Sequence, residues 1–148
     1  MKNTNTGSLS TKNDNPYCRV AEVVGQCFFV GMHNKPGMKP LDSKTMSGKL
    51  IDAIIFRLPF TCIKTNLCEV DYMPTDKEEI WEHNLAWDEK YNPVTGSIII
   101  LLGDWVNKNF MLKDCQKIIK LAHPASCYGR VNKEKYVLNA ISKINQMI

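Results

Sequence analysis

The sequence has no long apolar run. None of its apolar stretches approaches the ~20 consecutive residues that a membrane helix needs, so we expect no membrane association. The first 15 residues are polar, rich in Asn, Thr and Ser, and lack the apolar segment of a secretory signal. We therefore predict a disordered tail over residues 1–15 and a cytoplasmic protein.

Paired cysteines are also missing. The sequence has no C-x-x-C pair, and the cysteine spacings match none of the common zinc or iron–sulfur patterns. Most of the cysteines lie in or beside apolar runs, which is typical of small core side chains in a reducing compartment. We expect neither a metal site nor a cofactor. The cysteines are Cys18, Cys27, Cys62, Cys68, Cys115 and Cys127.

What the chain does have is an ordinary globular composition. Its 148 residues are 44% hydrophobic and 23% charged, which suits one domain with a real core. We assign that domain to residues 16–148 and expect it to act as a monomer. The net charge of +4 is compatible with a polyanionic partner without requiring one.

Short apolar runs alternate with segments of helical periodicity. The predicted strands are Cys27–Met32, Cys62–Leu67, Ser97–Leu102 and Ile118–Leu121, and the predicted helices are Ser47–Leu58, Glu78–Lys90, Asp104–Leu112 and a last one from Asn132. This alternation predicts an α/β protein, a three-layer α/β/α sandwich around a mostly parallel four-stranded sheet. Right-handed crossovers then place every loop that follows a strand at one edge, where α/β proteins bind ligands.

Local signals predict where the helices begin and which faces they bury. Ser47 is the predicted N-cap of the first helix, and Thr75 with Glu78 forms a predicted capping box for the second. In that second helix, Trp81 and Leu85 have the spacing of core residues. We also place Ile80 and Trp87 on this face. The segment Arg19–Val24 suits either a strand or a helical turn.

Three motifs on the predicted loop edge carry polar side chains. The first is Gly31–Gly37 (GMHNKPG), the second is Asn66 inside a strand, and the third is Leu121–Ser126 (LAHPAS). Asn is uncommon in strands, and a buried carboxamide needs hydrogen-bond partners. It offers a donor and an acceptor side by side.

In this order and on this topology, the motifs resemble those of the uracil-DNA glycosylase superfamily. That family has a strand ending in a Gly-x-(Asp/Asn/Glu)-Pro segment, a strand Asn that reads the base, and a His-Pro-Ser-like loop. The resemblance covers roughly Cys27 to the end of the chain and favours a compact member without iron–sulfur cysteines. It implies an enzyme that flips uracil or a related damaged base out of DNA and hydrolyses its N-glycosidic bond.

The resemblance also implies roles for individual residues. Asn66 would read the base, with Gly31 and Met32 beside it. His123 would stabilise the negative charge of the leaving base, as an oxyanion hole does. The residues that would contact DNA phosphates are Ser126, Arg130 and Lys133. No metal or redox cofactor is implied, and the partner is DNA containing uracil or a damaged base.

The first motif departs from the family pattern because it is two residues longer. Counting forward from Gly31 puts His33 in the catalytic position, whereas counting back from Pro36 puts Lys35 there. Asn34 matches the family's residue type but fits neither count. We therefore name His33 and Asn34 as catalytic candidates together with His123, and a general base at His33 is reasonable near neutral pH.

Other interpretations stay open. No carboxylate occupies the catalytic position, although Asp42 in the same loop is a possible substitute. The protein is then either a glycosylase-fold protein that binds a base or nucleic acid without cleaving it, or an unrelated α/β enzyme acting on a free nucleotide. The candidate residues also have structural explanations: a turn for His33 and Asn34, a loop contact for Asn66, and capping of a strand end for His123.

Overall fold

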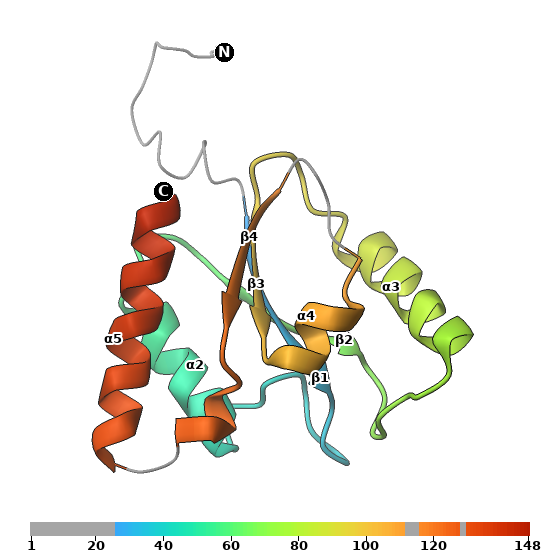
Figure 1. Ribbon diagram of the computed structural model, residues 1–148, viewed down its shortest axis with the longest axis horizontal. Helices are drawn as coiled ribbons and strands as arrows, with labels where there is room; N and C mark the ends of the chain where they lie inside the picture. Colours follow the sequence, from blue (N-terminus) through green and yellow to red (C-terminus); the bar gives the residue numbers. More distant parts are fainter. Residues whose placement is uncertain (1–25, 112–115, 128–129) are drawn as a thin grey trace.

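A single parallel sheet organises the chain (Figure 1). The computed structural model describes residues 26–111, 116–127 and 130–148. Its four strands run in the order β2-β1-β3-β4, and every neighbouring pair is parallel. The strands are β1 Cys27–His33, β2 Ile63–Cys68, β3 Ile98–Leu102 and β4 Lys117–Leu121. The predicted α/β sandwich is confirmed, and its sheet is wholly rather than mostly parallel.

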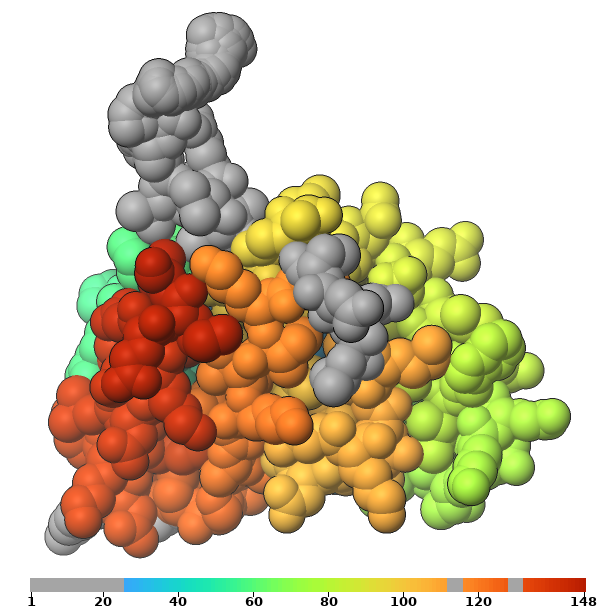
Figure 2. Space-filling model, turned by 45° about the horizontal axis from the view of Figure 1, so that its top comes forward, coloured from blue at the N-terminus to red at the C-terminus, as the bar shows by residue number. Residues whose placement is uncertain are grey.

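Helices cover both faces of this sheet. On one face lie α2 (Met46–Phe56) and α5 (Arg130–Met147), and on the other lie α3 (Lys77–Tyr91) and α4 (Asp104–Asn109). A short 3₁₀ turn, η1 (Pro124–Cys127), precedes α5. Figure 2 shows that residues of β4 and α4 form the surface between α5 and α3. This agrees with the position of β4 at the edge of the sheet.

The order of the strands reverses beside β1. The chain moves from β1 outward to β2, then returns past β1 to form β3 and continues outward to β4. Such a reversal splays the loops that follow the two central strands and opens a crevice at their carboxyl ends. The fold therefore places any ligand site near the loops that follow β1 and β3.

The core lies on both sides of the central strands. Successive residues of a strand point to opposite faces, so Phe29 packs toward α2 and α5 whereas Phe28 packs toward α3. The Phe28 and Trp87 rings meet edge to face with centroids 5.5 Å apart. All of β3 is buried, which is why its sequence is continuously apolar. Each such side chain contributes about 1.5–3 kcal/mol on burial.

Two predicted helix caps are wrong by one or two residues. Thr45, not Ser47, caps α2, because its Oγ1 accepts a 2.9 Å hydrogen bond from the backbone N–H of Gly48. The position is set by the preceding loop, where the Asp42 carbonyl accepts from the Thr45 N–H. Asp76, not Thr75, caps α3 and accepts from the Glu79 N–H at 3.0 Å.

The later helix ends also differ from the prediction. Helix α4 ends at Asn109 because Phe110 turns to extended backbone and places its ring in the core. Helix α5 begins at Arg130, before the predicted cap at Asn132. The predicted tail 1–15, the segment Arg19–Val24, and the residues Cys18, Leu112 and Cys115 lie outside the described ranges.

Helix α3 buries a narrower face than its sequence predicts. Trp87 is 3% exposed, as expected, but Trp81 is 54% and Leu85 45% exposed. The Trp87 indole contacts Phe28, Tyr91 and Phe110, so one large ring fills the space between this helix and the sheet. Trp81 and Leu85 are therefore left on the outer face.

The described cysteines are free thiols. Cys27, Cys68 and Cys127 are buried and Cys62 is half-buried, which agrees with a role as small core side chains. Within the described ranges, no helix combines the length and the hydrophobicity needed to cross a membrane.

Candidate functional site

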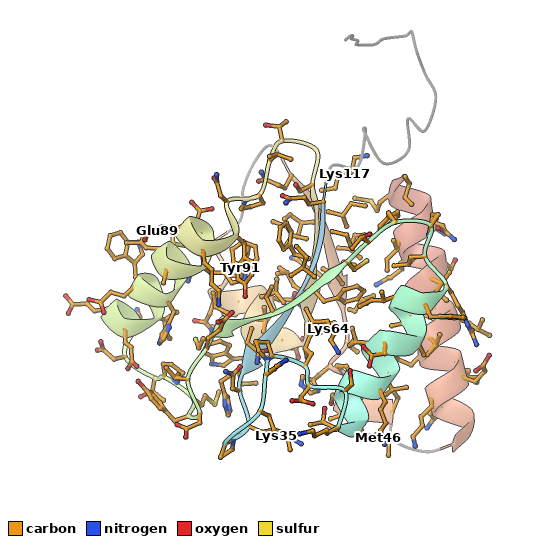
Figure 3. The ribbon with its side chains drawn as sticks, turned by 180° about the vertical axis from the view of Figure 1, so that it is seen from behind. Lys35, Met46, Lys64, Glu89, Tyr91 and Lys117 are labelled. Atoms are coloured by element: carbon orange, nitrogen blue, oxygen red, sulfur yellow. The ribbon has the colours of Figure 1, made fainter. Side chains whose placement is uncertain are left out.

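A pocket opens at the carboxyl edge of the sheet, beside the loop that follows β1. Met32 and His33 reach it from β1, Asn66 from β2, and His123 from the residue pair between β4 and η1. Its volume of about 170 Å³ equals roughly six water molecules at ~30 Å³ each. That volume suits one heterocyclic ring better than a whole nucleotide. Figure 3 shows Lys35 and Met46 at this edge.

The walls of the pocket combine apolar and basic side chains. Met32, Met38 and Leu41 form the apolar part, so a planar ring has aliphatic and thioether surface to pack against. None of the described lining residues is Phe, Tyr or Trp. Lys35 and Lys39 supply positive charge at the rim, and both are exposed.

Asn66 is the buried polar group of this site. It is 3% exposed, and its Nδ2 donates a 2.7 Å hydrogen bond to Oδ1 of Asn34. Its own Oδ1 is buried and has no hydrogen-bond partner among the described residues. An unpaired buried acceptor costs about 1–3 kcal/mol, and because this oxygen is closed to solvent, a ligand N–H would pair with it only after the side chains around it move. The carboxamide is therefore oriented by Asn34 but only half satisfied.

Gly31 gives this carboxamide its space. A Cβ at position 31 would lie 2.3 Å from the Asn66 Oδ1, so no larger residue fits without displacing it. Neither Gly31 nor Asn34 lines the pocket, although both were predicted as site residues. Both contact Asn66 instead: Gly31 leaves space for its Oδ1, and Asn34 accepts a hydrogen bond from its Nδ2.

The two pocket histidines carry their protons on different nitrogens. His33 Nδ1 lies 3.0 Å from the Asn34 carbonyl oxygen. Because a carbonyl oxygen can only accept, Nδ1 carries the proton. In the neutral ring, Nε2 is then free to act as a base. His123 Nδ1 instead accepts from the backbone N–H of Ala125 at 3.0 Å. The His123 proton is thus on Nε2, which makes that atom a donor. The pocket holds a potential base and a potential donor.

His123 is kept neutral by its surroundings. Burial, and next the positive charge of Lys35, lower its pKa from the usual 6.5. The imidazole therefore has no net charge at pH 7. Gly103 packs behind it: this residue has φ of +94°, and a Cβ there would lie 3.1 Å from the Cβ of His123. The turn after β3 thereby supports the loop after β4.

Asp42 lines the pocket but is occupied by its own loop. Its carboxylate accepts from the backbone N–H groups of Lys39 at 3.1 Å and Lys44 at 2.9 Å. The N–H of Lys44 and then that of Lys39 lower the pKa of Asp42, so it is ionised at neutral pH. It shapes the loop instead of presenting a free carboxylate.

Two of the predicted phosphate contacts, Ser126 and Lys133, are not among the described residues that line the pocket. The Ser126 hydroxyl donates to the carbonyl of His123 at 2.8 Å within η1, where it stabilises the turn. Lys133 is half-buried on α5. Arg130 is the first residue of α5, and its side chain is not among the described ones.

Sequence reasoning missed several members of the site. Lys39, Thr45 and Ser47 also line the pocket, but of these only Ser47 was named from the sequence, as a helix cap. The available signal was the length of the loop that follows β1, since long ordered loops are often functional. Which side chains of this loop point into the pocket depends on how the loop folds over β2.

No protein-family model, no curated protein and no solved structure matches this chain. Its chemistry is therefore inferred from the contacts described above.

Proposed function

We propose that the protein is a DNA glycosylase that hydrolyses the bond between deoxyribose and uracil, or a related damaged base, after flipping the base into this pocket. The observation that carries the proposal is the half-satisfied carboxamide of Asn66 in a pocket that also holds His33 and His123. The resemblance of the three sequence motifs to the uracil-DNA glycosylase superfamily supports the same function.

Base selection follows from the orientation of Asn66. Uracil presents an N3–H donor beside the O4 acceptor, whereas cytosine presents a bare N3 beside an amine. A small displacement of the side chains that cover Asn66 exposes its buried Oδ1, which then accepts from N3–H, and the second proton of Nδ2 is donated to O4. Since Asn34 holds the first Nδ2 proton, the carboxamide cannot turn over without losing that bond. Cytosine would place its bare N3, an acceptor, against Oδ1 and its amine, a donor, against Nδ2. Neither hydrogen bond forms, so cytosine is rejected.

Cleavage uses the two histidines in different roles. As the bond between C1′ and the base nitrogen breaks, its electron pair moves onto the base, and the Nε2–H of His123 donates to the developing anion. Water forms the new bond to C1′ and passes a proton to Nε2 of His33. The products are the free base and an abasic sugar. Asn34 acts as a positioning residue, because its Oδ1 is engaged by Asn66.

One observation favours the alternative of a protein that binds a base without cleaving it. Asp42 is the sole carboxylate among the described residues lining the pocket, and backbone N–H groups occupy it. A cationic sugar in the transition state would then lack a free carboxylate beside it. This alternative keeps Asn66 as the base reader but removes the catalytic role of His33.

Strand cleavage tests the proposal. Purified protein is incubated with uracil-containing single strands and with G·U, A·U and G·T duplexes, and abasic sites are then cleaved by alkali. We expect cleavage by the wild type, a roughly 10²–10⁴-fold lower kcat in His33→Gln, and a roughly 10²–10³-fold lower kcat in His123→Gln. The matched control is His83→Gln on α3, which lies outside this pocket. A folded wild type that binds uracil through Asn66 but cleaves none of these substrates would establish the alternative.

A further inference from the structure

A second hollow adjoins the base pocket on the outer side of the loop that follows β1. Its volume is about 620 Å³, and Lys39 and Asp42 line both spaces. The other walls come from Pro40, Ser43, Lys44 and Lys64. We call this hollow the lysine groove. Because the two spaces share Lys39 and Asp42, they lie next to each other on the surface.

The groove carries a net positive charge, because three lysines and one aspartate line it. Lys64 is compensated, since its Nζ lies 2.7 Å from Asp52 Oδ1 and 2.9 Å from Ser43 Oγ. Lys39 and Lys44 are exposed and form no ion pair with any described residue. The carboxylate of Asp42 accepts hydrogen bonds from their backbone N–H groups and also interacts electrostatically with both lysines.

Charge is strongly separated between this loop and the far side of the molecule. Residues 35–49, which span most of the loop after β1 and the first turn of α2, carry four lysines and one aspartate, a net charge of +3. Residues 76–91 carry six carboxylates and two lysines, a net charge of −4. Figure 3 shows Lys35 at the pocket edge and Glu89 on the outside of α3. A polyanion is therefore attracted to the loop after β1 and repelled from α3.

We infer that the lysine groove binds backbone phosphates next to the flipped nucleotide, with Lys39 and Lys44 as the phosphate ligands. The inference rests on the proposed function and adds to it the path of the DNA strand. A flipped base stays covalently attached to its backbone, so the flanking phosphates have to pass the mouth of the pocket. The groove shares Lys39 and Asp42 with that pocket, and its ammonium groups suit phosphates as point charges. Base identity plays no part in these contacts.

The test compares two charge-matched double variants. Lys39→Gln/Lys44→Gln removes the groove lysines, and Lys108→Gln/Lys117→Gln removes the same charge elsewhere. Lys108 is on α4, and Figure 3 shows Lys117 at the opposite edge of the sheet from Lys35. The affinity for a uracil-containing single strand is measured between 50 and 200 mM salt, together with cleavage, and thermal melting verifies folding. For two lost phosphate contacts, we expect the slope of log affinity against log salt to become shallower by ~1.4 in the groove variant.

The outcomes separate this inference from the proposed function. Cleavage by the wild type with a shallower slope only in the groove variant supports both. Cleavage by the wild type with equal slopes in the two variants contradicts the role of the lysine groove and supports the proposed glycosylase function. A wild type that cleaves no substrate, with a shallower slope only in the groove variant, keeps the groove as a nucleic-acid site and rejects the glycosylase.

Discussion

Asn66 on β2 donates a 2.7 Å hydrogen bond from Nδ2 to Oδ1 of Asn34, which stands 32 residues earlier in the chain. The bond joins the edge strand to the segment just after β1 and selects the direction in which the Asn66 carboxamide faces. The Oδ1 of Asn66 is buried and has no hydrogen-bond partner among the described residues. The proposed selectivity for uracil depends on the hydrogen bond between Asn66 and Asn34.

Replacing Asn66 tests base reading directly. Asn66→Asp loses both Nδ2 protons and sets a carboxylate against the O4 of uracil, so we expect discrimination between uracil and cytosine to fall. Asn66→Ala should lose affinity for the base altogether. Cleavage of matched strands that contain uracil or cytosine measures the effect. If both variants keep the selectivity of the wild type, Asn66 does not read the base.

Asn34 should be replaceable by a residue that keeps its acceptor. Asn34→Asp retains an oxygen for the Asn66 Nδ2, so we expect selectivity near that of the wild type. Asn34→Ala removes the acceptor, frees the carboxamide to turn over, and costs about 0.5–1.5 kcal/mol of stability. Selectivity assays and urea denaturation of the two variants separate positioning from folding. A direct catalytic role would instead impair Asn34→Asp as severely as Asn34→Ala.

Two glycine substitutions in the same motif should have different effects. Gly31→Ala places a Cβ 2.3 Å from the Asn66 Oδ1, so the carboxamide has to move, at a cost of about 1–3 kcal/mol. Gly37→Ala meets no atom within 4 Å, but its φ of +73° costs about 1–2 kcal/mol in backbone strain. Both should lower the melting temperature. KM should rise in Gly31→Ala alone, and an equal rise in both would show that the contact with Asn66 is unimportant.

The titration of His123 should depend on Lys35. Burial and then Lys35 lower the His123 pKa from 6.5, so we expect Lys35→Gln to raise it part of the way back, because burial remains. NMR titration of the three histidines measures this shift. An unchanged His123 pKa in Lys35→Gln would contradict the electrostatic contribution.

The lowered pKa of His123 also makes the free energy of unfolding depend on pH. Because the pKa of the folded state lies below that of the unfolded state, the unfolded chain binds the proton first as the pH falls. Stability is therefore lost from about pH 6.5 down to the pKa of the folded state. His123→Gln should show a smaller loss over this range in urea denaturation.

A buried hydrogen-bond chain behind the site offers a test of the fold. The Trp87 Nε1–H donates to Thr65 Oγ1, and the Thr65 hydroxyl donates to the carbonyl of Phe29, both at 2.9 Å. Thr65→Val keeps the shape but removes the acceptor of the indole N–H and the hydrogen bond to the Phe29 carbonyl, which should cost about 1–3 kcal/mol. Thr65→Ser keeps the hydroxyl and should lose less. Equal losses in urea denaturation would mean that packing dominates at this position.

Much of the architecture follows from local sequence. Apolar runs such as Ser97–Leu102 predict central strands because both faces of such strands are buried, and alternation with helical segments predicts the parallel sheet. The caps at Thr45 and Asp76 were missed by one or two residues, because neighbouring hydroxyl and carboxylate side chains compete for the same N–H groups. The outward orientation of Trp81 was also missed, since it depends on Trp87 filling the interface first.

For the site, the sequence by itself determined which side chains are available and, through the parallel topology, that Met32, His33, Asn66 and His123 meet at one edge. Only the tertiary structure decided how they are used. The hydrogen bond between Asn34 and Asn66 and the placement of Lys39 between pocket and groove both depend on the loop after β1 folding over β2. Such contacts join distant residues, so their geometry is set by the packing of the whole sheet and not by any local pattern.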